Sequence, residues 1–482
     1  MRAAHLGGLA AAASALVCLV CAGDAAAAGL YFSDRGVRPM GRGGAFVAGA
    51  DDLGAIWYNP AGIVDAPSGL LLDATWLHYT SDYTRQVLTT SATGTTYTQS
   101  YPRVSGSTPV LPVPTIAGSY RFGDQEQYAV ALGMYAPMTP VTTYPLTISN
   151  ADGSSSPAPQ RYSLVSLDGS ALVVTGAWFA WRPFDELRVG AGVQTLIGTF
   201  RSTVDFSACP PDNLVCAGEA PAYDAYSQLS VGPIVAPSGN LGATYVPMKK
   251  VRIGLSGQLP FWVDAPAKVD VRLPTAAEFD NAYQQGDNAR VRFQLPAVLR
   301  AGVEVRPLDD QDLRIELAYV REFWSEHQSI DITPTDIQLY KVTGFPSPFA
   351  VSPISIPRGG QDSNSIRLGG EYKIPIDTYF LQLRAGVAYE TSGIQEAYVS
   401  PLTIDSNKVA TTIGGSLYVG KHWRLDAALG HVFAADVTVT PQEAAVPRVN
   451  PVKGNPTATA SVNGGTYSAS ADTVGVGMQY AF

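Results

Sequence analysis

Side chains that could carry out acid–base or nucleophilic chemistry are sparse in this sequence. Beyond the N-terminal segment the histidines are His78, His327, His422 and His431, and neither Gly-x-Ser-x-Gly nor His-Glu-x-x-His occurs. Each of those motifs sets a nucleophile or a metal ligand at a fixed spacing from its partner group. We therefore expect a protein that is not an enzyme and that has no cofactor and no metal site.

The cysteines are the next reactive side chains. Residues 1–28 have the basic, apolar and small-residue regions of a secretory signal, and cleavage before Gly29 would leave Cys209 and Cys216 in the mature chain. In an exported protein two such cysteines in a polar, Pro-rich stretch predict a loop disulfide, whose small ring stabilises by roughly 2–3 kcal/mol. Zinc is the alternative, but a third and a fourth ligand are missing. A transmembrane anchor would need a longer apolar run than residues 6–22.

Charged side chains in the second half share one face of several alternating segments. The arginines are Arg314, Arg367, Arg384 and Arg424, and the acids are Glu316, Glu371, Glu390 and Asp426. We interpret them as a ladder of structural ion pairs that fills a narrow bore, with a selectivity ring as the alternative. The net charge of -9, with Lys and Arg scattered singly, argues against nucleic acid as a partner.

The elements that position these charges are strands. From residue 69 onward, apolar and polar side chains alternate in segments of roughly ten residues, as in strands with lipid on one face and a polar bore on the other. In the clearest segment, 289–307, we expect Val291, Leu295 and Leu299 outside, with Arg292 and Arg300 inside. The segment centres lie near residues 74, 117, 131, 174, 193, 241, 256, 298, 317, 368, 385, 413, 430 and 476. Short and long connections alternate between them.

These features predict an all-β transmembrane barrel of about 14 antiparallel strands over residues 69–482. The last strand alternates Val474, Val476, Met478 and Tyr480 with smaller or polar residues and ends at Phe482. This ending resembles the signal that the outer-membrane barrel assembly machinery recognises. It indicates a location in the outer membrane of a Gram-negative cell, with outer-membrane lipids around the barrel.

Residues 29–68 do not alternate. A lumen of this width cannot be filled by wall side chains alone, so we expect this segment to form a plug, or hatch, of short helices inside the bore. Asp51 or Asp52 can cap a short helix that runs through Trp57, and Asn59-Pro60 ends it because the residue before proline avoids the helical region.

The plug carries the most specific motif. Residues 41–50, the acidic pair Asp51-Asp52 and the sequence Tyr58-Asn59-Pro60-Ala61-Gly62 resemble the FadL/TodX (OmpP1) family of outer-membrane transporters for long-chain fatty acids and hydrocarbons. The resemblance implies a monomer with a defined route. Extracellular loops capture a hydrophobic ligand, a pocket above the plug binds it, the plug rearranges, and the ligand leaves sideways through an opening in the wall.

The same resemblance places that opening at a kink in the third strand. Here the corresponding segment is 128–138, where Gly133 lacks a side chain and Pro137 cannot donate to the ladder. Residues 133–138 are the candidate opening, and an ordinary strand end is the alternative.

Aromatic and methionine side chains are the candidates to line the ligand route, because an apolar chain gains roughly 0.8 kcal/mol per buried methylene. They are Phe46, Trp57, Tyr58, Met134, Tyr135, Met138, Phe261 and Trp262. Packing or an interfacial aromatic girdle is the alternative role for each. A carboxylate headgroup would need a cation, for which Arg42, Arg161 and the lumenal arginines are all candidates.

Three other functions compete with fatty-acid uptake. An aromatic-hydrocarbon channel differs only in cargo, which apolar pockets discriminate weakly. A general porin would have the same strands but should conduct ions, which a plug prevents. An outer-membrane lipid enzyme would need the catalytic motifs that the sequence lacks.

Overall fold

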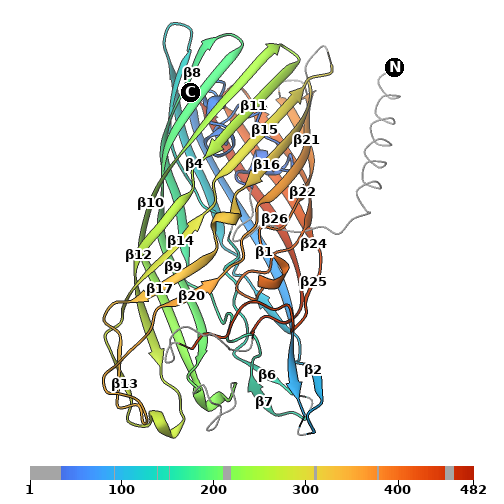
Figure 1. Ribbon diagram of the computed structural model, residues 1–482. Coiled ribbons are helices and arrows are strands. Elements are labelled where there is room, and N and C mark those ends of the chain that lie inside the picture. Colours follow the sequence, from blue (N-terminus) through green and yellow to red (C-terminus); the bar gives the residue numbers. More distant parts are fainter. Residues whose placement is uncertain are drawn as a thin grey trace.

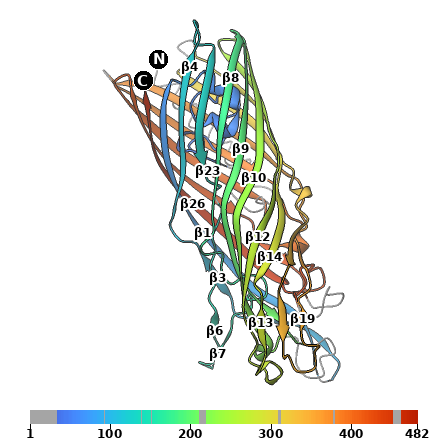
Figure 2. The same ribbon diagram turned by 90° about the vertical axis from the view of Figure 1, so that its left-hand side faces the viewer.

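A computed structural model describes residues 34–91, 93–137, 139–150, 152–209, 219–308, 312–376, 379–450 and 461–482. The predicted fold is confirmed: fourteen antiparallel strands close into a barrel around a plug of short helices (Figures 1 and 2). The barrel closes where β1 pairs with β26, from Gly69 opposite Ala481 to Arg85 opposite Gly465. Among the described residues, no helix is long and apolar enough to cross a membrane.

Four of the wall strands are each made of two pieces. The wall consists of β1 (Gly69–Thr90), β4 (Pro112–Phe122), β5 (Tyr128–Tyr135), β8 (Ala171–Phe184), β9 (Leu187–Ser207), β10 (Asp224–Met248), β11 (Val251–Gln258) with β12 (Phe261–Arg272), β14 (Asn288–Leu295) with β15 (Val298–Val305), β16 (Leu313–Glu322) with β17 (Ser329–Pro334), β20 (Ile354–Pro357) with β21 (Ser363–Ile376), β22 (Tyr379–Glu390), β23 (Lys408–Val419), β24 (Trp423–Ala434) and β26 (Gly465–Ala481).

Smaller elements fill the plug and the long connections. They are α2 (Val37–Met40), α3 (Ala55–Tyr58), η1 (Pro60–Val64), β2 (Thr96–Ser100), β3 (Val104–Ser107), β6 (Thr147–Ser149), β7 (Ser155–Pro157), η2 (Pro221–Tyr223), η3 (Ala277–Phe279), β13 (Tyr283–Gln285), η4 (Trp324–Glu326), β18 (Gln338–Tyr340), β19 (Phe349–Ala350), η5 (Glu396–Tyr398) and β25 (Val437–Val439).

Short and long connections lie at opposite ends of the barrel. The short turns, such as those joining β8 to β9 and β23 to β24, share one end with the C-terminus, while β2, β6, β7 and β13 extend from the other (Figure 1). The plug lies nearer the short turns. We call these the plug end and the loop end. In a Gram-negative outer-membrane barrel, short turns face the periplasm and long loops face outward.

The plug is enclosed by the wall. Residues 35–50 are all buried, and so are 52–64. The prediction that Asp51 or Asp52 caps the helix through Trp57 is wrong, because α3 begins after Gly54 and has no side-chain cap. Asp52 instead accepts the Gly54 N–H at 2.8 Å. Asn59 ends α3 as predicted, and its side chain accepts the Ala61 N–H and so caps η1.

The breaks in the four two-piece strands lie side by side. Residues 259–260, 296–297, 323–328 and 358–362 interrupt the strands. At their plug-end borders, Gln258 pairs with Val298, Val298 with Glu322, and Glu322 with Ser363. Pro260 and Pro296 stand in two of these breaks and have no N–H for the ladder. The alternation therefore shifts by one residue at those two breaks, which exchanges the inward and outward faces.

This shift corrects the prediction for residues 289–307, which form two strands rather than one. On β15, Leu299 is exposed and Arg300 is buried, as expected, but on β14 Val291 and Leu295 are buried and Arg292 points outward. The inward face is thus polar around the plug and apolar toward the loop end. On the loop-end side of the breaks, the outward face of the wall bears exposed ion pairs, such as Arg290 with Asp264 at 2.5 Å.

Candidate functional site

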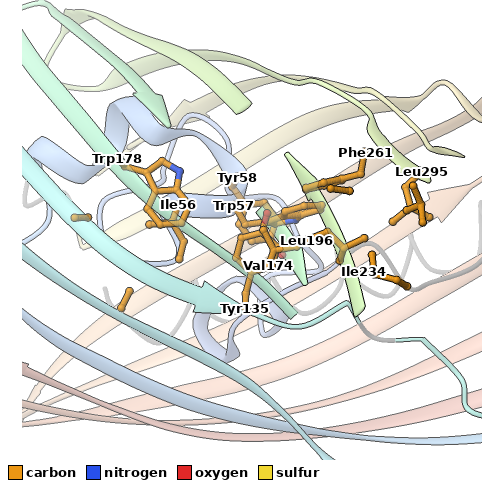
Figure 3. Close-up of a cluster of buried hydrophobic side chains, with 14 of the residues drawn as sticks. Ile56, Trp57, Tyr58, Tyr135, Val174, Trp178, Leu196, Ile234, Phe261 and Leu295 are labelled. Carbon is orange, nitrogen blue, oxygen red and sulfur yellow. The ribbon is translucent and has the colours of Figure 1, made fainter. Parts of the chain in front are cut away.

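An apolar lining covers the inward face of the wall between the plug and the loops (Figure 3). We use this name for buried side chains of one continuous cluster. Its wall members include Tyr135, Val174, Leu196, Leu229, Val231, Ile234, Phe261, Val263, Val291, Leu295, Ile330 and Ile332. Because these residues come from strands spread along β5 to β17, the lining is a property of the closed barrel rather than of any local segment.

The plug forms the floor of this lining. Trp57 meets the ring of Tyr135 edge-on at 5.2 Å between centroids, and Phe46 meets Tyr58 at 5.7 Å. The Arg300 guanidinium lies 4.3 Å from the centre of the Trp57 ring, which marks the boundary between the polar and the apolar bore. Burial raises the pKa of the Tyr58 hydroxyl, and Asp34 adds to the effect, so the hydroxyl stays neutral.

The structure brings together five of the eight predicted ligand-route residues. Phe46, Trp57, Tyr58, Tyr135 and Phe261 belong to the apolar cluster. Met134 and Trp262 do not belong to this cluster. Each is next to an inward-facing residue of its strand and therefore points outward. Trp262 has 59% of its surface exposed. Met138 lies outside the described residues.

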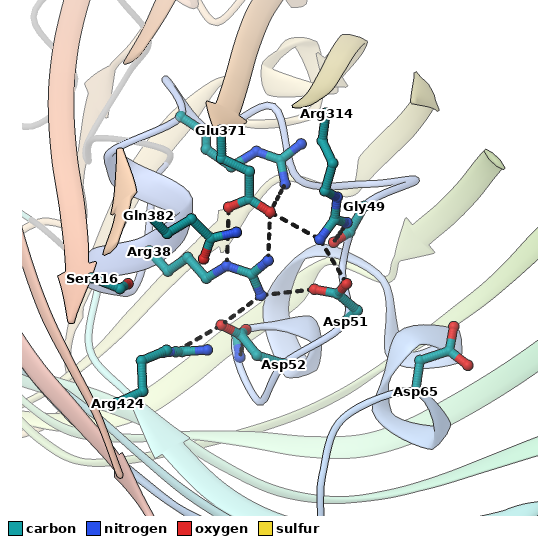
Figure 4. Close-up of polar contacts among 12 residues, drawn as sticks. Arg38, Gly49, Asp51, Asp52, Asp65, Arg314, Glu371, Gln382, Ser416 and Arg424 are labelled. Carbon is teal, nitrogen blue, oxygen red and sulfur yellow. Dashed lines mark hydrogen bonds and ion pairs between the residues drawn. The ribbon is translucent and has the colours of Figure 1, made fainter. Parts of the chain in front are cut away.

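An ion-pair network beneath the floor holds the plug in the wall (Figure 4). Its arginines are Arg38, Arg42, Arg314, Arg384 and Arg424, and its acids are Asp51, Asp52, Glu304, Glu316, Glu371 and Asp426. At its centre, the Glu371 carboxylate lies 2.7 Å from Arg38 of the plug and 2.8 Å from Arg314 of β16. Burial alone would raise the pKa of Asp51, but Arg314 and Arg38 outweigh it and hold that pKa well below its usual range.

Arg42 is enclosed by the wall. Its guanidinium lies 3.1 Å from Glu304, 3.2 Å from Glu316 and 3.5 Å from Glu371, and the side chain has no exposed surface. Glu316 also accepts the N–H groups of Val47, Ala48 and Gly49 at 2.6, 2.9 and 2.9 Å. Arg42 is therefore a structural residue and not the cation for a ligand headgroup.

The predicted ladder of lumenal ion pairs is confirmed. Arg384 lies 3.1 Å from Glu371, Arg367 lies 3.0 Å from Glu390, and Arg424 lies 2.8 Å from Asp426. The sequence did not reveal that Arg38, Arg42, Asp51 and Asp52 of the plug complete the ladder. These buried charges bind one another and the plug, which is the arrangement of a structural network rather than of a selectivity ring.

The Asn59-Pro60-Ala61 motif anchors the plug to the opposite side of the wall. The Asn59 amide donates to the Val47 carbonyl at 2.9 Å and to Thr244 of β10 at 3.1 Å. A Cβ placed at Gly190 of β9 would lie 2.4 Å from the Pro60 carbonyl carbon. The motif therefore needs both its amide and a side-chain-free strand surface beside it.

The wall is closed at Gly133. This residue pairs with Ala117 of β4 and with Gly176 of β8, and the ladder on both sides continues to Tyr135, where β5 ends. Beyond Tyr135 the wall is continued by isolated bridges from Thr143 to Ser107 and to Ser166. Pro137 lies in the stretch between Tyr135 and Thr143.

The loop end contains an apolar cavity that adjoins the lining. It lies among β9, β10, β12 and β17 and the loops above them, and its wall includes Phe206, Val271, Phe279, Ile332, Leu339 and Ile354. Ile332 belongs also to the apolar lining. Near the cavity, Cys209 is buried and disulfide-bonded, while Cys216, its predicted partner, lies outside the described residues.

Sequence reasoning missed the inward role of the apolar residues toward the loop end. Pro260 and Pro296 could have indicated this role, because they interrupt segments that otherwise alternate regularly and so mark the points where the strands break. Among the described residues, no group of three or more His, Cys, Asp or Glu side chains is arranged to hold a metal ion.

Comparison with known proteins matches residues 18–482 to the family described as outer membrane protein transport protein (OMPP1/FadL/TodX). A putative outer membrane protein of Neisseria meningitidis is 24% identical over 95% of both chains. A crystal structure of a Pseudomonas aeruginosa FadL homologue superposes with a TM-score of 0.68 at 15% identity, covering 94% of this chain and 100% of the other. The toluene transporter TbuX of Ralstonia pickettii superposes with a TM-score of 0.57 at 18% identity, covering 93% and 99%.

Proposed function

Because the chain belongs to the OMPP1/FadL/TodX family of outer membrane transport proteins, we propose that it takes up long-chain fatty acids or similar hydrophobic compounds. The family consists of transporters and not of enzymes, and its barrels lie in the Gram-negative outer membrane. The observation that carries the proposal is the exchange of faces at the strand breaks, which turns apolar side chains inward above the plug. A porin for hydrated solutes would need a polar bore along its whole length.

The route begins at the loops. The apolar cavity near Phe206 and Leu339 captures the ligand, which then passes along Ile332 to the apolar lining. Each methylene that leaves water for such a surface contributes roughly 0.8 kcal/mol. The hydrocarbon chain of the ligand therefore becomes more fully buried as it descends toward the plug. Trp57 and Tyr58 of the plug form the deepest contacts of this path.

The ligand leaves sideways. The plug network beneath Trp57 blocks the way to the plug end, since Arg42 and its carboxylates fill the bore. The proposed exit lies at Pro137 of the candidate opening, just beyond Tyr135, where β5 has left the ladder and isolated bridges complete the wall. A rearrangement of the plug shifts Trp57 away from Tyr135 and joins the lining to this exit.

The protein works as a monomer surrounded by outer-membrane lipids. The last strand, β26, pairs with β24 and β1 and ends beside an exposed Phe482. That exposed terminal aromatic residue supports recognition by the barrel assembly machinery. A monocyclic aromatic hydrocarbon is the second candidate cargo, favoured by the aromatic rings of Trp57, Tyr135 and Phe261 in the lining.

Uptake into vesicles tests the proposal. Proteoliposomes that contain the protein should take up labelled oleate saturably and should show no steady ion conductance. Asn59→Ala, which removes the hydrogen bonds to Val47 of the plug and to Thr244 of the wall, should reduce uptake, and Asn364→Ala on the outward face of β21 is the control. Strong competition by toluene would move the cargo toward hydrocarbons, and steady conductance without uptake would refute the transporter.

A further inference from the structure

Gln194 is a buried amide with an unused hydrogen-bond donor. It lies on the inward face of β9, and only 2% of its surface is exposed. Its Oε1 accepts the Tyr135 hydroxyl at 2.5 Å. Among the described residues, its Nε2 has no hydrogen-bond partner. Because a buried donor without an acceptor destabilises a protein, a molecule that brings an acceptor is favoured at this position.

A second buried amide nearby shows what a structural amide does in this part of the wall. Asn240 of β10 donates to the Ile56 carbonyl of the plug at 2.9 Å and accepts the Trp178 indole N–H at 3.1 Å. Both ends of the Asn240 amide are thus used to fasten the plug and a neighbouring wall side chain. The free donor distinguishes Gln194 from this arrangement.

The neighbours of Gln194 belong to the proposed ligand route. Leu196, two residues further along the same face, is a member of the apolar lining, and so is Tyr135 (Figure 3). The Tyr135 ring meets Trp57 of the plug edge-on, with 5.2 Å between the ring centroids. Tyr135 is also the last residue of β5 before the proposed exit. The free donor therefore lies where the plug, the lining and the exit meet.

The proposed movement of the plug exposes this pair of side chains to the ligand. In the docked plug the Trp57 ring contacts Tyr135, and its withdrawal joins the lining to the exit. The Tyr135 hydroxyl and the Gln194 amide then face the passing molecule. Both groups are uncharged, and together they offer a donor and an acceptor. An alcohol matches the pair, because its oxygen accepts from the amide while its proton is donated to the tyrosine oxygen.

We propose that Gln194, together with Tyr135, binds the uncharged hydroxyl of a hydrophobic alcohol on its way from the apolar lining to the exit. This inference rests on the proposed function and adds long-chain alcohols to its substrate class. The hydrocarbon part of the ligand is stabilised by burial on the lining, while the oxygen removes the cost of the unpaired amide donor. A plain hydrocarbon leaves that donor unpaired, so the site distinguishes the two kinds of ligand.

The test compares two ligands that differ by one hydroxyl. Binding of radiolabelled 1-dodecanol and dodecane to the protein in nanodiscs is measured, and partition into empty nanodiscs is subtracted. Gln194→Met keeps an unbranched side chain but removes the amide, so it should weaken 1-dodecanol binding about tenfold and should not weaken dodecane binding. Thr195→Val, on the outward face of the same strand, is the matched control and should bind both ligands as the wild type does.

Oleate, titrated in parallel, separates this inference from the proposed function. If the wild type binds oleate but not 1-dodecanol, or if Gln194→Met weakens 1-dodecanol and dodecane equally, the alcohol site is overturned while the proposed function stands. Failure of the wild type to bind any of the three ligands would overturn both.

Two further variants keep the test decisive. If Gln194→Met does not fold, Gln194→Leu replaces it, because leucine also lacks the amide. Tyr135→Phe removes the hydroxyl and leaves the amide in place. A tenfold loss of 1-dodecanol affinity in Tyr135→Phe, with no loss in either Gln194 variant, would assign the alcohol to the tyrosine alone and refute the role of Gln194.

Discussion

Replacing Arg42 by methionine should free the plug without unfolding the barrel. Arg42 has no exposed surface and contacts Glu304, Glu316 and Glu371 at 3.1, 3.2 and 3.5 Å. Methionine is unbranched and apolar but shorter and uncharged, so these carboxylates would lose a shared cation. Removing one partner of a buried ion pair typically costs about 3–5 kcal/mol. That cost changes the ratio of docked to undocked plug by about 10²- to 10⁴-fold.

Single-channel conductance in planar bilayers measures the undocked fraction. The wild type should stay closed, and Arg42→Met should show frequent or steady openings at an unchanged heat-modifiable mobility of the folded barrel. Arg290→Gln is the control, because its pair with Asp264 is about half exposed and is worth at most about 1 kcal/mol. Conductance of Arg42→Met equal to that of the wild type would refute the role of the network as the plug lock.

Three further results are expected. Gly386→Val should expel the plug and open the pore in the same conductance assay, because a Cβ at Gly386 would lie 2.1 Å from the backbone of Arg42. Gly257→Ala is the control and should behave as the wild type, because the nearest neighbour of a Cβ at Gly257 is 3.8 Å away. Phe261→Ala should weaken oleate binding about tenfold or more, because it removes a buried ring. Trp262→Ala, on the outward face, should leave oleate binding unchanged. Equal losses of oleate affinity in the two variants, measured by titration, would contradict the assignment of faces. Reducing the disulfide at Cys209 should leave the thermal unfolding of the barrel unchanged and increase protease cleavage of the adjoining loop; a large fall in the unfolding temperature would show that the bridge supports the wall.

The strands could be predicted because a membrane barrel imposes a period of two on every segment. All the predicted segment centres fall within the wall strands, and residue 298 is the first residue of β15. The face of each residue could be predicted only as far as the next break. Pro260 and Pro296 shift the phase by one residue, so alternation alone assigned Val291 and Leu295 to the wrong side.

The candidate site was predictable in part for a similar reason. Ion pairs between neighbouring strands, such as Arg384 with Glu371, follow from regular register, and the sequence predicted them. The contacts of Arg42 with Glu304 join residues 262 positions apart, and no local pattern encodes them.

Photocrosslinking would test most directly whether a hydrophobic ligand lies on the apolar lining above the plug. A fatty acid with a diazirine near the end of its chain is bound to the protein in nanodiscs, irradiated, and its attachment sites are mapped by mass spectrometry. The account predicts adducts on inward residues such as Phe261, Val291 and Ile332, which excess oleate suppresses. Adducts confined to outward residues such as Trp262 and Leu299, unaffected by oleate, would contradict it.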